Sequence, residues 1–193
     1  MRSTRCWRLG ALVLGLALVA FGVQSAVAGS RHAGQPPEQT PGSPAFGTVS
    51  GKNITAVKVV TAFGNITFSG TTYTDVPSMS TTISVPVGQT ARLITRFSAE
   101  TECTTSVSTA GWCGVRILVD GVEADPATGT DFAFSSTNNG TAVADTWASN
   151  ALERVSQVLA EGSHTVKVQW RTTDPTITIW LGELNLTIER VKL

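Results

Sequence analysis

The feature that most constrains the fold is an alternation of apolar and polar side chains with a period of two, which starts near Ile54 and recurs to the end of the chain. Successive side chains of a β-strand point to opposite faces, so this period is typical of strands with one face turned toward a core. The runs are rich in Thr, Val and Ile, which favour strands. The apolar rows are Val57, Val59; Ile83, Val85, Val87; Leu93, Phe97; Val115, Ile117, Val119; Phe132, Phe134; Val166, Val168, Trp170; and Leu184, Leu186, Ile188.

Turn sequences separate these rows at spacings suited to an antiparallel β-sandwich. They are 86–89, 120–121, 125–126, 138–140 and 161–163. Asp120-Gly121 fits a two-residue type I′ hairpin turn, which needs a positive φ at both central positions. The sequence therefore predicts an all-β, jelly-roll-like sandwich over residues 54–193.

The segment from Asp145 to Ala160 fits two interpretations. Its apolar residues Ala151, Leu152, Val155 and Leu159 can form one face of a helix, and three of them also share one face of a strand. Because a turn at Gly162 and a clear strand follow, the strand interpretation is favoured.

The first 53 residues differ in composition from the rest. Residues 1–28 combine three arginines, an apolar run and Ala26-Val27-Ala28, a pattern typical of a secretory signal peptide cleaved after Ala28. An uncleaved membrane anchor is the alternative. Residues 29–53 are rich in Gly, Pro and Ser, which predicts a flexible linker. We therefore expect a secreted, extracellular protein.

Charge limits the range of partners. The chain has 14 basic and 14 acidic residues, and three of the basic ones lie in the predicted signal peptide, which leaves 11 against 14. A mildly acidic surface without a basic stripe disfavours nucleic acid as a partner. No second long apolar segment follows, so we expect no membrane insertion after cleavage.

Cys103 and Cys113 are the two cysteines that remain after the predicted cleavage. In an exported chain, such a pair is expected to form a disulfide. A metal site or a catalytic thiol is the alternative, but the only histidines are His32, in the predicted linker, and His164, at a strand edge. We expect His164 to cap the row of Val166, Val168 and Trp170.

Four acidic residues gather around one hairpin and the loop after it: Asp120, Glu123, Asp125 and Asp131. Oxygen-rich loops hold calcium, so these residues are candidate calcium ligands. Their spacing matches no calcium-binding repeat, and turn formation explains Asp120 and Asp125 equally well. No other cofactor is expected.

Glu100 and Glu102 share one face of a predicted strand. Paired carboxylates can hydrolyse glycosidic bonds, one acting as acid and the other as base or nucleophile. The alternative is that both are simply solvated at the end of a strand.

Tryptophans provide the candidate ligand-binding residues. Trp170 belongs to an apolar row and is expected in the core, whereas Trp180 alternates with apolar neighbours and is expected on the polar face. Trp112, in the predicted disulfide loop, and Trp147, among polar residues, are further candidates for exposure. Flat exposed rings would stack on sugar rings; the alternative is that they cover the edges of the core.

Asn-x-Thr tripeptides occur at Asn53, Asn65, Asn139 and Asn185. They would be glycosylation sites in a eukaryotic secretory pathway. The signal peptide looks bacterial, and Asn65 and Asn185 fall within predicted strands, so we expect no modification.

Several stretches carry a resemblance: 96–100, 115–121, 162–170 (Gly-Ser-His-Thr-Val-Lys-Val-Gln-Trp) and 184–190. They resemble a set of uncharacterised secreted bacterial β-sandwich proteins and, more distantly, jelly-roll domains of the C1q and TNF type. The resemblance implies a jelly-roll fold and, if it extends to assembly, a homo-oligomer with a binding role.

Together these features favour a secreted or cell-surface binding or structural module without catalysis, contacting a polysaccharide or a protein through its loops. The alternative is a small extracellular carbohydrate-active hydrolase or lyase that uses the paired carboxylates.

Overall fold

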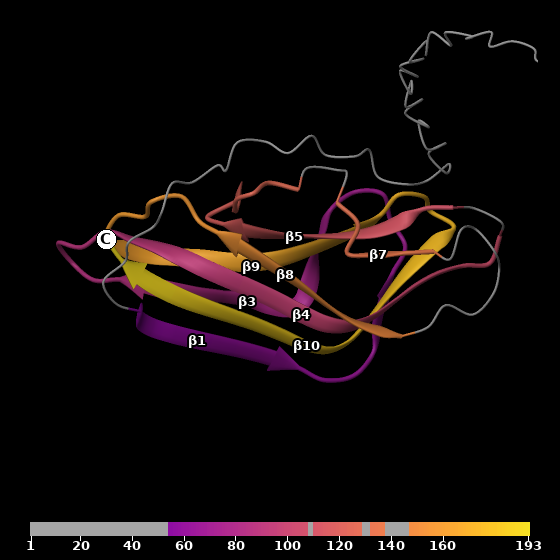
Figure 1. Cartoon of the computed structure of the whole chain (residues 1–193), viewed down its shortest axis with the longest axis horizontal. Helices are drawn as coiled ribbons and strands as arrows, with labels where there is room; N and C mark the ends of the chain where they lie inside the picture. Colours follow the sequence, from indigo (N-terminus) through magenta and orange to yellow (C-terminus); the bar gives the residue numbers. More distant parts are fainter. Residues whose placement is uncertain (1–53, 108–109, 129–131, 138–146) are drawn as a thin grey trace, which may run out of the picture. The chain divides into compact units, whose positions relative to one another are not determined.

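The computed structural model describes residues 54–107, 110–128, 132–137 and 147–193. These residues form two antiparallel β-sheets that pack against each other, which confirms the predicted all-β sandwich (Figure 1). No described residue belongs to a helix that could cross a membrane. The predicted signal peptide and linker, Asp131, Asn53 and Asn139 lie outside the described residues.

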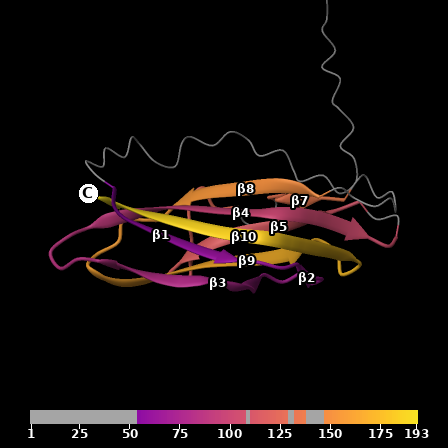
Figure 2. The same cartoon turned by 90° about the horizontal axis from the view of Figure 1, so that it is seen from below.

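The described residues contribute ten strands to the two sheets. They are β1 (Ile54–Ala62), β2 (Ile66–Phe68), β3 (Thr74–Val85), β4 (Ala91–Thr105), β5 (Trp112–Val119), β6 (Val122–Glu123), β7 (Ser135–Ser136), β8 (Ala148–Val155), β9 (Gly162–Thr172) and β10 (Ile177–Lys192). Sheet A has the order β1-β10-β4-β8, with β2 also paired to β10. Sheet B has the order β3-β9-β5-β6, with β7 also paired to β5. Figure 2 shows β4 and β8 in one layer and β3 and β9 in the other.

The pairing follows a jelly-roll pattern. The antiparallel pairs β1–β10, β3–β9, β4–β8 and β5–β6 are nested in the sequence and fall alternately in sheet A and sheet B. One long antiparallel ribbon rolled into two sheets produces this order. The ambiguous segment after Asp145 forms the strand β8, as favoured.

The core lies between the sheets and receives alternate residues of the long strands. In β10, Ile177, Ile179 and Leu181 are fully buried, and in β9 Val166, Val168 and Trp170 are buried, as predicted. Phe97 of β4 packs on Phe134 with ring centroids 5.7 Å apart. Cys103 of β4 and Cys113 of β5 form the predicted disulfide, which joins the two sheets with a Cα–Cα distance of 6.0 Å.

The edge strand β1 does not turn its predicted apolar row toward the core. Its prominent apolar row, Val57 and Val59, faces solvent with 59% and 53% exposure, while Ala56, Val60 and Ala62 pack on the core. Both faces of this strand carry apolar residues, so the period alone does not say which face turns inward. Lys58 shares the inward row and donates to the carbonyl of Thr82 on β3 at 2.7 Å, which links the edges of the two sheets.

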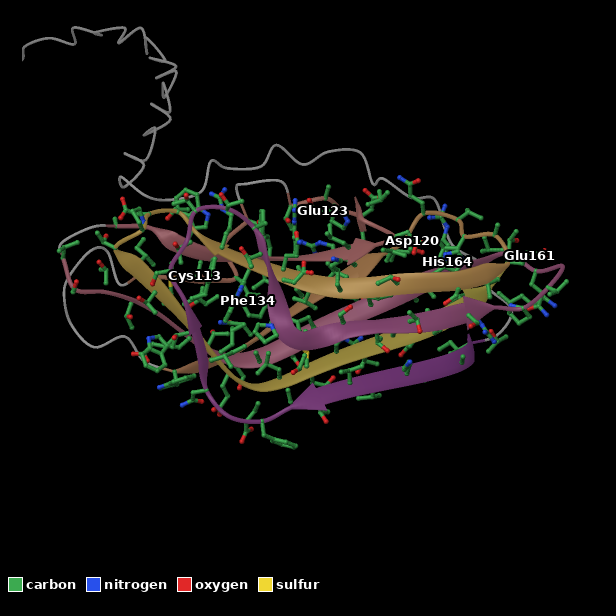
Figure 3. All side chains as sticks on the ribbon, turned by 180° about the vertical axis from the view of Figure 1, so that it is seen from behind. Cys113, Asp120, Glu123, Phe134, Glu161 and His164 are labelled. Atoms are coloured by element: carbon green, nitrogen blue, oxygen red, sulfur yellow. A yellow bond between two sulfur atoms is a disulfide. The ribbon has the colours of Figure 1, made fainter. Side chains whose placement is uncertain are left out.

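Phe132 and Phe134 are predicted as a strand row, but the regular strand begins after them, at Ser135. Phe134 nevertheless enters the core, where its N–H donates to the carbonyl of Cys113 at 2.9 Å. Figure 3 places Phe134 and Cys113 close together.

Candidate functional site

A bulge in the long strand β10 lies at the centre of the candidate site. The pairing of β10 with β4 shifts register between Gly182 and Asn185, and Glu183 within this bulge has a φ of 49°. On the other side of β10, β1 ends opposite Leu184 and β2 begins opposite Leu181. Bulges commonly re-aim side chains next to functional sites. Here the bulge lies where the strand paired with this edge of β10 changes from β1 to β2.

The outer face of sheet A at this bulge carries the paired carboxylates. Glu100 pairs with Gly182, and Glu102 pairs with Trp180. The intervening Thr101 is fully buried, as are Ile179 and Leu181 of β10. Since side chains alternate along a strand, Glu100, Glu102 and Trp180 all point away from the core.

Trp147 reaches this cluster from β8. It directly precedes Ala148, which pairs with Thr101 of β4. A Cβ atom built on Gly182 would lie 3.6 Å from Cζ3 of Trp147, so the indole crosses β4 and ends above β10. The side chain is 42% exposed. An aromatic ring that packs on a sheet and stays partly open to solvent offers a flat apolar surface to a ligand.

Gly182 makes this arrangement possible. The same added Cβ would lie 2.7 Å from Oδ1 of Asn65, which is closer than real Cβ contacts allow. A larger residue would therefore displace the Asn65 amide and crowd the indole. In strands, a glycine of this kind marks a close approach of other groups to the backbone.

We call this part of the outer face of sheet A the platform: Trp147, Trp180, Glu100, Glu102, Asn65 and Thr67, together with Gly182, which is buried beneath Trp147 and Asn65. Thr67 of β2 pairs with Trp180, so the platform extends across β2, β10 and β4 to the start of β8. At about 4.8 Å per strand, it spans roughly 14 Å. Trp180 itself is half-buried, less open than its polar-face position suggests.

Trp112 does not belong to the platform. It lies on β5, where Cys113, Val115 and Ile117 face the core, so Trp112 faces the outer side of sheet B. The side chain is half-buried, and its Nε1 is buried with no hydrogen-bond partner among the described residues. Of the three candidate tryptophans, the structure brings together Trp147 and Trp180 and separates Trp112 from them.

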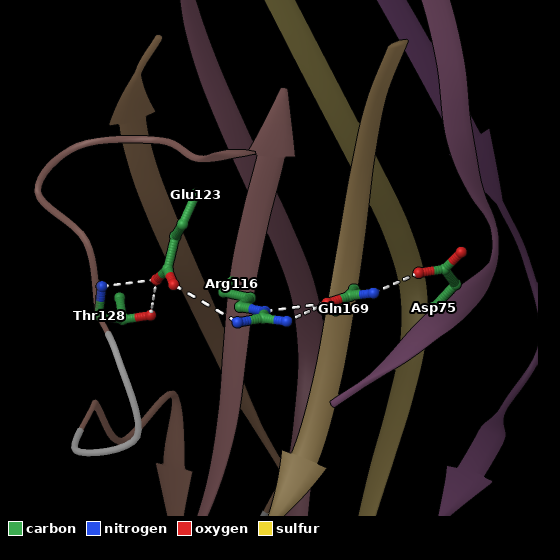
Figure 4. Close-up of polar contacts among 5 residues, drawn as sticks. All are labelled: Asp75, Arg116, Glu123, Thr128 and Gln169. Carbon is green, nitrogen blue, oxygen red and sulfur yellow. Dashed lines mark hydrogen bonds and ion pairs between the residues drawn. The ribbon is translucent and has the colours of Figure 1, made fainter. Parts of the chain in front are cut away.

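The outer face of sheet B carries a chain of polar contacts (Figure 4). Arg116 donates from Nε to Oε1 of Gln169 at 2.9 Å, and Gln169 donates to Asp75 at 2.6 Å. Lys167 and then Gln169 hydrogen-bond Asp75 and lower the pKa of its carboxyl group. Glu123 accepts from the Thr128 N–H at 2.6 Å and lies 3.6 Å from Arg116.

An aromatic ring lies beneath this network. The Arg116 guanidinium lies 4.1 Å from the centroid of the Tyr73 ring, and that of Arg171 lies 5.5 Å from it. Burial raises the pKa of the Tyr73 hydroxyl, although its hydrogen bond with Thr128 acts in the opposite direction. The contacts join β3, β5 and β9 to the loop after β6, so they hold this loop against sheet B.

Asp120 and His164 form a separate pair at the turn between β5 and β6 (Figure 3). Asp120 and Gly121 have φ values of 52° and 80°, which confirms two positive φ angles in the predicted turn. Nδ1 of His164 lies 2.7 Å from Oδ2 of Asp120, and Nε2 lies 2.9 Å from the carbonyl oxygen of Ala160. Both partners are acceptors, so the geometry favours the imidazolium form.

The pKa values of this pair move apart. Burial lowers the pKa of His164, but the hydrogen bonds to Asp120 and Ala160 outweigh it, and the net pKa is raised. Burial raises the pKa of Asp120, but the hydrogen bonds from His164 and the Thr165 N–H outweigh it, and the net pKa is lowered. The pair thus clamps the β5–β6 turn to the start of β9.

The described residues among the predicted calcium ligands make separate contacts with other residues and do not converge on one point. Asp120 binds His164, Glu123 binds Thr128 and Arg116, and the backbone of Asp125 pairs with Val155. Within the described ranges, no three His, Cys, Asp or Glu residues lie close enough together to hold a metal ion. Asp131 lies outside these ranges, so its part in the predicted site stays a prediction.

Sequence reasoning named four residues of the platform, Trp147, Trp180, Glu100 and Glu102, but treated the tryptophans and the carboxylates as separate hypotheses. It missed Gly182 and Thr67, and it considered Asn65 only as an Asn-x-Thr tripeptide within a strand, whereas Asn65 lies in the connection between β1 and β2. A glycine inside an otherwise apolar strand run is a signal for a bulge or a close approach, and Gly182 stands in such a run. Asn65 gives no comparable signal, because its contact with Gly182 depends on the pairing of β2 with β10.

Comparison of the chain with known proteins gives no family assignment: the sequence matches no protein-family model and no curated protein.

Proposed function

We propose that the domain is a non-catalytic carbohydrate-binding module that acts outside the cytoplasm and binds its ligand on the platform of sheet A. The observation that carries the proposal is the Trp147 indole lying over Gly182 beside Trp180, with Glu100 and Glu102 on the same face. This places the ligand on a sheet face, whereas the sequence pointed to loops.

The chemistry of the platform suits a sugar. A pyranose ring has apolar C–H faces and a rim of hydroxyl groups. Trp147, at 42% exposure, offers an apolar surface for the faces. Carboxylates accept hydrogen bonds from hydroxyl groups, and the Asn65 amide both donates and accepts them. An aromatic surface with a few polar groups at its edge is a common design for orienting a small ligand.

The prediction of export is consistent with the same proposal. The disulfide between Cys103 and Cys113 is compatible with an oxidising compartment. The predicted signal peptide would deliver the domain there, where polysaccharides are abundant. The Gly- and Pro-rich segment before Ile54 would then serve as a spacer.

The test is a binding assay of the full chain against a panel of extracellular polysaccharides, read by tryptophan fluorescence or calorimetry. Trp147→Ala is expected to weaken binding by about tenfold or more, because removing a stacked aromatic anchor typically has that effect. Val87→Ala is the matched control: Val87 is 87% exposed and lies in the turn between β3 and β4, near the opposite end of β4. Equal affinity of Trp147→Ala and wild type for every ligand would refute the proposal.

A second candidate function is hydrolysis of the bound glycan. Glu100 and Glu102 lie two residues apart on one face of β4, so their Cα atoms are about 7 Å apart. Side chains that extend in parallel from these positions would hold their carboxyl groups at a similar separation, which falls in the range of about 6.5–9.5 Å used by inverting glycosidases. Incubation with a bound polysaccharide distinguishes the two functions: release of reducing ends that stops in Glu100→Gln would establish the hydrolase, and intact polymer would favour the binding module.

A further inference from the structure

Phe63 is an exposed aromatic residue that lies beside the platform but outside it. It directly follows the last residue of β1, and its side chain is 84% exposed. Among the Phe, Tyr and Trp side chains of the described residues, those of Phe63 and Trp147 alone are exposed. A single apolar side chain on a surface needs no explanation, but exposed rings that gather at one place in a fold form a candidate contact surface.

The strand pairing of β10 places Phe63 at the bulge. β1 runs along β10 and ends opposite Leu184, and β2 begins opposite Leu181 (Figure 1). The connection between β1 and β2 therefore passes beside the bulge. Phe63 and Asn65 both belong to this connection, and Asn65 lies against Gly182.

Gly64 sets the shape of this connection. Its φ of 92° lies in the left-handed region, where a side chain would be strained. A Cβ atom added to Gly64 would meet no other atom within 4 Å, so the backbone conformation, and not crowding, calls for glycine here. The turn separates Phe63 from Asn65, so that the ring is exposed while the amide lies against β10.

The two exposed rings reach the bulge from opposite sides of β10. Trp147 comes from the β8 side, crosses β4 and ends above Gly182, whereas Phe63 comes from the β1 side. Trp180 lies on β10 itself, two positions before Gly182. A strand rises about 3.3 Å per residue and neighbouring strands lie about 4.8 Å apart, so the Cα atoms of Phe63 and Trp180 are roughly 11 Å apart. The aromatic surface is therefore longer than one sugar ring.

We propose that Phe63 is a third aromatic contact for the ligand, and that the domain binds a stretch of several linked sugars instead of a single sugar. The inference rests on the proposed carbohydrate-binding function and adds the form of the ligand. Trp180 and Trp147 contact one part of the sugar chain, and Phe63 contacts the sugars beyond Trp147. Each ring packs on apolar C–H faces, a contact that requires no charge on the ligand, so a neutral polymer fits.

The test measures the affinity of the full chain for cello-oligosaccharides and chito-oligosaccharides, from disaccharide to hexasaccharide, by calorimetry. In a series that binds, wild type should bind the hexasaccharide more tightly than the disaccharide. Phe63→Ala should weaken binding of the hexasaccharide by about five- to tenfold, because truncation of an aromatic anchor typically has an effect of this size, and should leave binding of the disaccharide unchanged. Phe63→Tyr keeps the ring and should bind as wild type does.

Two controls separate the ligand contact from folding and from general loss of apolar surface. Phe63→Ala and wild type should unfold at the same urea concentration, because the exposed ring buries little surface within the protein. Val59→Ala is the matched control: Val59 is exposed on β1, four residues before Phe63, and its loss should change no affinity.

Equal affinity of Phe63→Ala and wild type for the hexasaccharide, or an equal loss for both lengths, would overturn the inference. If Trp147→Ala still weakens binding in that case, the carbohydrate-binding function stands. Failure of both oligosaccharide series to bind wild type would also overturn the inference, and the polysaccharide panel then decides the proposed function by itself. If Trp147→Ala changes no affinity, both fail.

Discussion

Loss of the Cys103–Cys113 disulfide should destabilise the domain by an amount that follows from the length of the loop it closes. The two cysteines are 10 residues apart in sequence and both are buried in the core. They join the end of β4 to the start of β5, and therefore sheet A to sheet B. Cys103 pairs with Ile179, next to the Trp180–Glu102 pair, so the disulfide also anchors the strand under the platform.

The expected magnitude comes from chain entropy. Closing a loop of about ten residues in the unfolded chain removes entropy worth about 2.7 kcal/mol at 25 °C. For a domain of roughly 140 residues, this loss in the free energy of unfolding corresponds to a fall in Tm of about 10 °C. Replacing both cysteines by alanine adds a packing loss of about 1 kcal/mol per sulfur atom, because both side chains are buried.

Urea unfolding followed by tryptophan fluorescence separates these two contributions. Wild type is compared with reduced wild type, in which the sulfur atoms remain in the core, and with Cys103→Ala/Cys113→Ala. Reduction alone should lower the free energy of unfolding by about 2.7 kcal/mol, and the alanine variant should lose more. A loss below about 0.5 kcal/mol on complete reduction would refute the chain-entropy reasoning for this loop.

Three further perturbations give distinct outcomes. Glu183→Gly should raise the free energy of unfolding by about 0.5–1 kcal/mol, because a left-handed φ of 49° strains any residue with a Cβ; urea unfolding measures it. Phe97→Ala should lower that free energy by about 3–5 kcal/mol, since Phe97 is fully buried against Phe134; the same assay applies. His164→Gln should lower the free energy of unfolding by about 0.5–1 kcal/mol near pH 5 and by less at alkaline pH. This magnitude is kept small because the Asp120 side chain is 43% exposed and solvent screens the pair.

The pH dependence has a definite sign. His164 has a raised pKa in the folded state, so its contribution is complete below the unfolded value of 6.5 and is lost as pH rises through the folded pKa. Asp120 has a lowered pKa, so its contribution is present above 3.8 and is lost as pH falls through the folded pKa. The stability difference between wild type and His164→Gln should therefore be largest between these limits. A difference that grows as pH rises above neutrality would contradict this assignment.

Glu183→Gly and Phe97→Ala each have a control variant. Glu189→Gly, in the same strand but without a positive φ, should destabilise by about 1 kcal/mol, opposite in sign to Glu183→Gly. If both glycine variants lose stability equally, the strain assigned to Glu183 is absent. For the core, Phe97→Leu should cost less than Phe97→Ala, and equal losses would argue against a packing origin.

The sequence by itself determined the class of fold and the covalent link. Alternation at Val166, Val168 and Trp170 predicts a half-buried strand because the strand period is a local property of the backbone. Asp120-Gly121 predicts its turn because the demand for positive φ is also local. The Cys103–Cys113 pair follows from counting the cysteines that would remain after the predicted cleavage.

Tertiary structure decided which face of each strand turns inward and which distant residues meet. Val57 and Val59 alternate as a core row would, yet they face solvent, because β1 carries apolar residues on both faces and the contacts of β10 and β3 fix its orientation. Trp147 and Gly182 are 35 positions apart in sequence, and Asn65 is farther still. They meet only because β8, β4, β10 and β2 lie side by side in sheet A, and strand order depends on non-local pairing that a local pattern does not encode.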